Sequence, residues 1–190
     1  AGGKGANQSV ALARAGATVL HVGAVGDEGT WLRQGLADDG VDVRHVHSLR
    51  TPGGHAVIQV DDSGQNSIVI FGGANLMLTP GLIEAALQDA EPGDMLLLQN
   101  ETNALEDAIA AGRKAGLRVV LNPAPMSPLI ASLPLADVDL LIVNEHEGAA
   151  LAGSGLDARA ILAGLDTRLP GTDVCLTLGA QGAVLRRAGK

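Results

Sequence analysis

Short runs of aliphatic residues alternate along the chain with longer stretches in which apolar residues recur every three or four positions. The first pattern is typical of buried strands and the second of amphipathic helices. The predicted strands cover residues 18–22, 95–99, 118–121, 140–143 and 174–178. The predicted helices cover residues 7–15, 29–38, 80–88, 103–115, 145–151 and 158–168. Alternating strands and crossover helices predict an α/β protein with a mostly parallel sheet.

One segment breaks this alternation. The stretch GHAVIQVDDSGQNSIVIFGG contains two β-type runs joined by the turn-forming residues 61–64, which predicts an antiparallel hairpin over about residues 55–71. A hairpin inserted in an α/β chain can serve as a lid or as a contact between subunits, or it can be a plain surface hairpin. The pattern alone does not separate these interpretations.

The composition then narrows the function classes. The 190 residues are 46% hydrophobic and include one Trp, one Phe and no Tyr, so the core is aliphatic and no aromatic platform exists for stacking nucleic-acid bases. The net charge of −8 argues against a nucleic-acid or anionic-membrane surface, since both need clustered Lys and Arg. The chain shows neither a membrane-spanning run nor a signal peptide. We therefore expect one cytoplasmic domain.

The first residues, AGGKGANQ, form a glycine-rich lead into the first predicted helix. Such a lead exposes backbone N–H groups at a helix N-terminus, which suits an anion or a ligand rich in hydroxyl groups. Lys4 is followed by Gly5 rather than by Ser or Thr, so the phosphate-loop pattern is not met. A tight turn without a ligand remains the alternative.

Polar residues at the ends of predicted strands are the next candidates, because ligands of open α/β sheets bind there. Glu101 follows the strand 95–99, where its carboxylate can accept hydrogen bonds from vicinal sugar hydroxyls. An acidic helix start is the alternative interpretation. The turn containing Thr177, Gly179 and Gly182 offers backbone amides that a nucleotide phosphate can approach closely, although an ordinary hairpin turn has the same pattern.

Asn144 ends another predicted strand, and Glu147 lies one helical turn later on the same side. The pair can orient a hydrated Mg²⁺ and the phosphates that it bridges, because Mg²⁺ keeps most of its waters and takes few protein carboxylates. The same spacing also fits a capping box that needs no ligand. His146 between them is interpreted as a surface residue of the helix.

Several segments, taken in order and spacing, resemble the ribokinase family of ATP-dependent sugar and nucleoside kinases. They are GGKGANQ, GDEGTWLRQGLADDGVDV, FGGAN, LNPAP, VNEHE and TLGAQG. The resemblance spans essentially all of residues 1–190. It implies a partial kinase domain with a three-layer α/β/α architecture and a mostly parallel central sheet, incomplete at both ends. The hairpin of about residues 55–71 corresponds to part of a small β lid.

The resemblance also implies roles for particular residues. Those implied to contact the sugar are Gly3, Lys4, Gly5, Asn7 and Glu101. Those implied to bind the nucleotide are Asn144, Thr177, Gly179 and Gly182, with Glu147 serving the metal. The implied cofactors are ATP and Mg²⁺, with K⁺ as a candidate monovalent activator. A homodimer formed through the lid is the candidate assembly, with no nucleic-acid or membrane partner.

The implied reaction is the phosphorylation of a sugar hydroxyl, with D-ribose converted to ribose 5-phosphate as the first expectation. Another sugar or a nucleoside is the alternative substrate. The family's Asp-Thr-x-Gly-Ala-Gly-Asp signature, which brings the catalytic base and the anion hole, is absent from the 190 residues. No catalytic residue is therefore assigned, because this chemistry depends on both positioning and charge stabilisation. We expect residues 1–190 alone to be inactive, as a fragment or a non-catalytic binding module.

Overall fold

The structure, a computed structural model, describes residues 2–189 except for the side chains of residues 66 and 68. The chain divides into two compact units. Unit 1 comprises Ala1–Leu82 and Glu101–Asn103, and unit 2 comprises Ile83–Asn100 and Ala104–Lys190. Within the described residues, no helix is long and apolar enough to cross a membrane.

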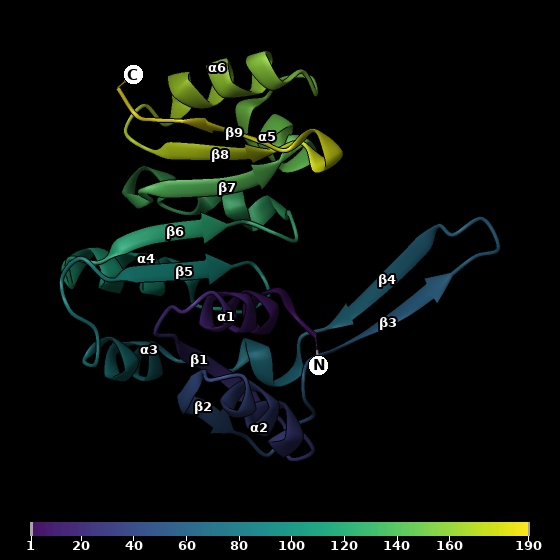
Figure 1. The fold of residues 1–190 in the computed structure, drawn as a ribbon, viewed down its shortest axis with the longest axis vertical. Helices are drawn as coiled ribbons and strands as arrows, with labels where there is room; N and C mark the ends of the chain where they lie inside the picture. Colours follow the sequence, from purple (N-terminus) through teal and green to yellow (C-terminus); the bar gives the residue numbers. More distant parts are fainter. Residues whose placement is uncertain (1, 190) are drawn as a thin grey trace. The chain divides into compact units, whose positions relative to one another are not determined.

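Unit 1 combines a parallel pair of strands with an antiparallel hairpin (Figure 1). Its elements are α1 (Lys4–Arg14), β1 (Leu20–Val25), α2 (Thr30–Asp38), β2 (Asp42–Ser48), β3 (His55–Val60), β4 (Asn66–Phe71) and the 3-10 helix η1 (Gly73–Leu76). β1 and β2 form the parallel pair, and both α1 and α2 contact β1. A small cluster of buried side chains, Ala24, Ala74 and Leu78, fixes η1 and the residues after it to β1.

Unit 2 is built on a five-stranded sheet in the order β5-β6-β7-β8-β9 (Figure 1). The first four strands run parallel, and β9 is antiparallel to β8. The strands are β5 (Met95–Gln99), β6 (Arg118–Asn122), β7 (Leu140–Asn144), β8 (Asp173–Thr177) and β9 (Ala183–Arg186). The helices are α4 (Leu105–Lys114), α5 (Glu145–Ala152) and α6 (Ala158–Arg168), with 3-10 turns η2 (Pro128–Ser132), η3 (Leu135–Asp137) and η4 (Gly179–Gln181). α3 (Pro80–Leu87) begins in unit 1 and continues into unit 2.

The core of unit 2 consists of aliphatic side chains from its central strands and from the helices that pack on them. Parallel strands are covered by helices and therefore become almost continuously apolar. The fully buried members include Ile109, Val119, Leu121, Leu141, Ile161, Leu165, Val174 and Leu176. This burial explains why the aliphatic runs of the sequence mark these strands so clearly.

Local polar contacts set where the elements of unit 2 end. Gly153 terminates α5 in the left-handed conformation (φ 67°), which a residue without a side chain adopts readily. Asp157 begins α6, and its carboxylate accepts a hydrogen bond of 2.9 Å from the Ala160 N–H.

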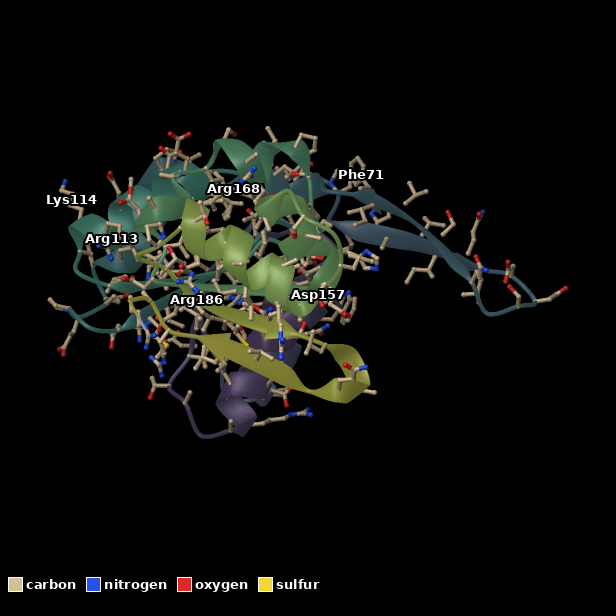
Figure 2. All side chains as sticks on the ribbon, turned by 90° about the horizontal axis from the view of Figure 1, so that it is seen from above. Phe71, Arg113, Lys114, Asp157, Arg168 and Arg186 are labelled. Atoms are coloured by element: carbon tan, nitrogen blue, oxygen red, sulfur yellow. The ribbon has the colours of Figure 1, made fainter. Side chains whose placement is uncertain are left out.

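Arg186 of β9 lies beside α6 (Figure 2), where its Nη1 donates to the Asp166 carboxylate at 2.8 Å. This ion pair joins β9, at the edge of the sheet, to α6.

The predicted α/β class with a mostly parallel sheet is confirmed. The strands predicted at 95–99, 118–121, 140–143 and 174–178 agree with β5 to β8 within one residue at each end. The hairpin is also present over the predicted residues. The first predicted strand is displaced, because β1 covers Leu20–Val25. β2 is absent from the prediction, since its sequence, DVRHVHS, carries polar side chains among its valines.

Two helices begin two or more residues away from the predicted start. α1 begins at Lys4 rather than at residue 7, so the glycine-rich turn is shorter than predicted. Gly3 takes the N-cap position with φ 98°, which favours glycine. α4 begins at Leu105 rather than at residue 103, because Ala104 is left-handed (φ 57°) and the Asn103 side chain binds the Leu78 backbone.

Candidate functional site

The N-terminus of α1 in unit 1 carries a carboxylate from a distant part of the chain. The Lys4 backbone N–H, at the first position of the helix, donates to Glu101 Oε2. Lys4 Nζ lies 4.0 Å from Glu101 Oε1, and a Cβ placed on Gly3 would lie 3.6 Å from Oε2. The structure therefore brings Gly3, Lys4 and Glu101 together, although 97 residues separate the last two.

Glu101 replaces a side-chain cap, since the Gly3 N-cap position has none of its own. The negative charge is favourable there, because the exposed N–H groups give the helix N-terminus a partial positive charge. About a quarter of the Glu101 side chain stays exposed. The exposed carboxylate can accept hydrogen bonds from hydroxyl groups, and the nearby ammonium of Lys4 can donate to their oxygens.

Gly5 and Asn7 complete the set of residues predicted to contact a sugar. Gly5 lies in the first turn of α1, and the Asn7 backbone N–H donates to the Gly3 carbonyl oxygen at 3.0 Å. Asn7 is solvent-exposed one turn along from Gly3. Residues three and four apart share a face of a helix, so Asn7 lies on the face that also carries Lys4.

In unit 2, Asn144 and Glu147 form a complete capping box at the start of α5. Asn144 Oδ1 accepts from the Glu147 N–H at 2.9 Å, and Glu147 Oε2 accepts from the Asn144 N–H at 3.0 Å. The capping box that the sequence analysis gave as the alternative interpretation is therefore present. The metal-binding role of Glu147 stays a prediction. His146 is exposed, as expected for a surface residue of the helix.

The residues predicted to bind the nucleotide also come together at the carboxyl ends of β7 and β8. Asn144 and Thr177 are paired across these strands, and Thr177 Oγ1 donates to the Val143 carbonyl at 3.3 Å. The following turn contains Gly179 (φ 55°) and Gly182 (φ 90°). A Cβ at either glycine would have no heavy atom within 4 Å, so the backbone of this turn is open to close approach by a ligand.

As a single carboxylate, Glu147 suits a metal ion that keeps most of its water ligands. It suits less well a metal ion that takes all its ligands from the protein. Among the described residues, no group of three or more His, Cys, Asp and Glu side chains is placed to hold a metal ion. Glu147 is buried beside the exposed Asn144. Mg²⁺ uses one or two carboxylates and several waters, so a single carboxylate at this strand end is compatible with it.

The strands β3 and β4 pair as an antiparallel hairpin (Figure 1), and consecutive positions along both strands carry exposed apolar side chains. Phe71 marks its base in Figure 2, and the side chains of both strands extend beyond it. The described apolar side chains that are at least half exposed are Val57, Ile58, Val60, Val69, Ile70 and Phe71. Exposed apolar surface of this kind marks an interaction site more often than an inert one.

The base of the hairpin contains a residue that the sequence analysis missed. Glu28 Oε1 accepts a hydrogen bond of 2.6 Å from the Gly53 N–H. Hydrogen bonds from its own backbone N–H and from Gly53 hold the pKa of Glu28 below its usual value. A Cβ on Gly26 would lie 2.4 Å from the Gly53 nitrogen, and one on Gly73 would lie 2.5 Å from the Pro52 oxygen. The sequence signal that could have identified Glu28 is the acidic pair Asp27 and Glu28 between two glycines.

Comparison with known proteins gives one consistent family. A model of the pfkB family carbohydrate kinases matches residues 1–190. Ribokinase from Haemophilus influenzae is 36% identical over 100% of this chain and 64% of its own length. Ribokinase from Schizosaccharomyces pombe is 35% identical over 98% of this chain and 63% of its own length. The chain thus spans less than two thirds of these curated relatives.

Solved structures agree with these sequence matches. The structure of Arabidopsis thaliana ribokinase complexed with ribose and ATP superposes with a TM-score of 0.84 at 30% identity, covering 100% of this chain and 64% of that one. Ribokinase from Cryptococcus neoformans in complex with ADP gives a TM-score of 0.84 at 33% identity, covering 100% of this chain and 65% of that one.

Proposed function

The chain belongs to the pfkB family of carbohydrate kinases, and from this premise we propose that the protein phosphorylates a sugar hydroxyl with ATP, D-ribose being the first candidate. The observation that carries the proposal is the Glu101 carboxylate at the N-terminus of α1, beside Gly3 and Lys4. A carboxylate, an ammonium group and exposed helix amides together suit a polyhydroxylated ligand. A relative solved with ribose and ATP supports the same substrate pair.

In the proposed reaction the sugar hydroxyl oxygen attacks the γ-phosphorus of ATP, and the bond from that phosphorus to the β,γ-bridging oxygen breaks. ADP leaves, and the hydroxyl proton passes to a general base. We assign no base to residues 1–190, which lack the family's Asp-Thr-x-Gly-Ala-Gly-Asp signature. The residues of this chain therefore bind and orient the two substrates.

We assign the nucleotide to the carboxyl ends of β7 and β8. Asn144 and Thr177 are neighbours there, and the phosphates can approach the backbone of the turn at Gly179 and Gly182, where no heavy atom lies within 4 Å of a Cβ position. Glu147 is the carboxylate that would hold the water shell of Mg²⁺ on those phosphates, and the metal would supply charge neutralisation there. K⁺ is the proposed monovalent activator, which a comparison of rates in K⁺ and Na⁺ buffers tests.

The assay that tests the function measures ADP release by the complete protein with ribose, 2-deoxyribose, fructose or adenosine as acceptor. Ribose should give the highest kcat/KM. 2-Deoxyribose is the second candidate, since a deoxyribokinase from Salmonella typhi is 34% identical over 96% of this chain. ADP release that no acceptor stimulates would contradict the proposal.

Two substitutions test the sugar site within that assay. Asn7→Ala or Glu101→Ala should cost sugar binding about 1–3 kcal/mol for each lost hydrogen-bonding partner. The KM for ATP should change little. Glu106→Ala is the matched control, because Glu106 is an exposed carboxylate in the first turn of α4. Wild-type sugar kinetics in both site variants would remove Asn7 and Glu101 from the site.

We also propose that two copies of the protein associate through the hairpin β3–β4. One face of the hairpin carries Ala56, Ile58, Val60 and Ile70, and the described side chains among them are exposed. A second hairpin laid on this face would remove that apolar surface from water. Light scattering after size exclusion should show a dimer for the complete protein and a monomer for Ile58→Glu. An unchanged mass in that variant would exclude this interface.

A further inference from the structure

The two residues after Glu101 bind another segment of unit 1. Thr102 Oγ1 donates to the Asn75 carbonyl oxygen at 2.7 Å. Asn103 uses both ends of its amide, since Oδ1 accepts from the Leu78 N–H at 3.1 Å and Nδ2 donates to the Leu78 carbonyl at 2.8 Å. One side chain therefore satisfies both backbone groups of one residue, which would otherwise need separate partners.

The segment that receives these hydrogen bonds is itself held firmly. Ala74 is fully buried and Leu78 is nearly so, and both pack against Ala24 of β1. The Ala74 N–H donates to the Pro52 carbonyl at 3.0 Å. Because side chains in a packed cluster have little room to shift, Asn75 and Leu78 offer fixed points of attachment.

The backbone around Glu101 shows why such attachment is needed. Glu101–Asn103 belong to unit 1, whereas Asn100 before them and Ala104 after them belong to unit 2. Ala104 adopts φ 57°, an uncommon conformation for a residue with a side chain. Unfavourable backbone conformations of this kind persist where surrounding contacts hold them. The hydrogen bonds of Thr102 and Asn103 are the contacts that precede this turn directly.

We propose that Thr102 and Asn103 are positioning residues for Glu101. By binding Asn75 and Leu78, they fix the backbone of this short segment so that the Glu101 carboxylate meets the N-terminus of α1. The inference rests on the proposed function, in which Glu101 binds the sugar. Hydrogen bonds to a ligand depend on sub-ångström placement of their acceptor, so loosening the segment weakens sugar binding while Glu101 itself is still present.

Kinetics of the complete protein test this role with matched variants. Thr102→Val removes the hydroxyl and keeps the shape, whereas Thr102→Ser keeps the hydroxyl. Asn103→Ala and Thr102→Val should raise the KM for ribose by about 3- to 10-fold, the loss expected for a misplaced hydrogen-bond acceptor, and leave the KM for ATP within about twofold. Thr102→Ser should restore the wild-type KM.

Asn100→Ala is the control for general damage to this loop. Asn100 precedes Glu101 directly, but its Nδ2 donates within unit 2, to the Pro125 carbonyl at 2.6 Å and to Ser127 Oγ at 3.0 Å. This variant loses the same kind of side-chain amide contact and should keep the wild-type KM for ribose. A KM raised as much by Asn100→Ala as by Asn103→Ala would overturn the specific role of Asn103.

Two further measurements separate positioning from stability. If Asn103 acts through Glu101, the double variant Glu101→Ala/Asn103→Ala has the same KM for ribose as Glu101→Ala alone. Hydrogen exchange at the Lys4 amide should be faster in Asn103→Ala, while the amides of β1 exchange at wild-type rates. Additive effects on KM, or an unchanged exchange rate at Lys4, would overturn the proposal. Hydrogen exchange at Lys4 tests the positioning role even if the protein phosphorylates no sugar. Absence of sugar phosphorylation would contradict the proposed function but not the positioning role.

Discussion

Glu147 and Glu101 each accept a hydrogen bond from the backbone at a helix start, and they do so over very different distances in sequence. Glu147 binds the N–H of Asn144, three residues before it, within a local capping box. Glu101 binds the N–H of Lys4, 97 residues before it. Both contacts stabilise the helix that they cap. An ionised carboxylate has about four acceptor sites, so either group can accept hydrogen bonds from a ligand while it keeps its backbone contact.

Glu147→Gln separates the capping role of Glu147 from a metal-binding role. Gln keeps the capping box, because its side-chain oxygen still accepts from a backbone N–H. Loss of the negative charge should cost only about 0.3–1 kcal/mol of stability. If Glu147 serves Mg²⁺, ADP release by the complete protein should need more Mg²⁺ and reach a lower maximum, with ribose KM unchanged. A Mg²⁺ titration of the variant that superposes on the wild-type curve would exclude the metal-binding role of Glu147. A thermal melt run beside it measures the loss of stability that the capping role predicts.

His21 gives unit 1 a dependence on pH. Its Nδ1 shares a hydrogen bond of 2.8 Å with Oγ of the buried Ser9, and burial lowers the pKa of the imidazole. The unfolded chain therefore binds a proton more readily than the folded one. The contribution of His21 is complete above about pH 6.5 and is lost as the pH falls below that value, by at most about 1.4 kcal/mol per pH unit.

Urea unfolding followed by circular dichroism at pH 7.5, 6.5 and 5.5 measures this dependence. Histidines elsewhere in the chain contribute equally to the wild type and to a His21→Gln variant, so the difference between the two isolates His21. The variant should lose less stability than the wild type between pH 6.5 and 5.5. Equal losses would show that His21 takes up no additional proton on unfolding.

At the scale of elements, the hairpin β3–β4 differs from the central strands β6, β7 and β8 in how it is held. All described side chains of its two strands are exposed, whereas β6, β7 and β8 each contribute fully buried residues. Among the described residues, close contacts of the hairpin with the rest of unit 1 lie at its base, where Gly26, Gly53 and Gly73 bring backbones into contact and Glu28 binds the Gly53 N–H. The stability of the hairpin therefore depends on a few positions at one end.

Gly73→Ala tests that dependence, with Gly64→Ala as its control. Both glycines have positive φ values, 49° and 82°, but only Gly73 lacks room for a Cβ, since Gly64 has no heavy atom within 4 Å of that position. Gly64→Ala should cost about 1–2 kcal/mol from the backbone alone. Gly73→Ala should cost about 1–3 kcal/mol more from overpacking. Thermal melts measure both, and equal costs would contradict the close packing of the base.

The elements that could be predicted from sequence are those whose signal is local. Aliphatic runs identify β5 to β8, and the Asn144 to Glu147 spacing predicts the capping box. The start of α1 depends on a carboxylate 97 residues away, and the start of α4 depends on an Asn103 side chain bound to Leu78. Contacts of that kind leave no periodic pattern, so both helix starts and the partners of Glu101 were missed.

At the scale of the whole molecule, the proposed site residues are divided between the two units. Those proposed for the sugar, Gly3, Lys4, Gly5, Asn7 and Glu101, belong to unit 1. Those proposed for the nucleotide and metal, Asn144, Glu147, Thr177, Gly179 and Gly182, belong to unit 2. Each unit therefore carries its own set of proposed binding residues. The proposed reaction also needs a general base, and the family signature that carries this base is absent from the 190 residues.

Purified residues 1–190 should accordingly show no phosphorylation of ribose above background in a coupled ADP-release assay. Charge stabilisation and proton removal together account for most of the rate of such a transfer, so substrate-binding residues alone are insufficient. The complete protein, assayed in parallel, is the positive control. Turnover by residues 1–190 at a rate near that of the control would mean that one of their own carboxylates acts as the base.

The base of the hairpin has an evolutionary consequence. Its contacts are made by backbone atoms of Gly26, Gly53 and Gly73 and by one carboxylate, Glu28. Beyond the base, the described side chains of both strands are exposed, and their neighbours across the hairpin belong to the hairpin itself. The hairpin can therefore lengthen, shorten or change its side chains without cost to the rest of unit 1. We therefore expect the sequence of this segment to vary among relatives with the ligand or partner that the hairpin contacts. A hairpin transplanted from a relative should fold on this unit as long as Gly26, Glu28, Gly53 and Gly73 are kept.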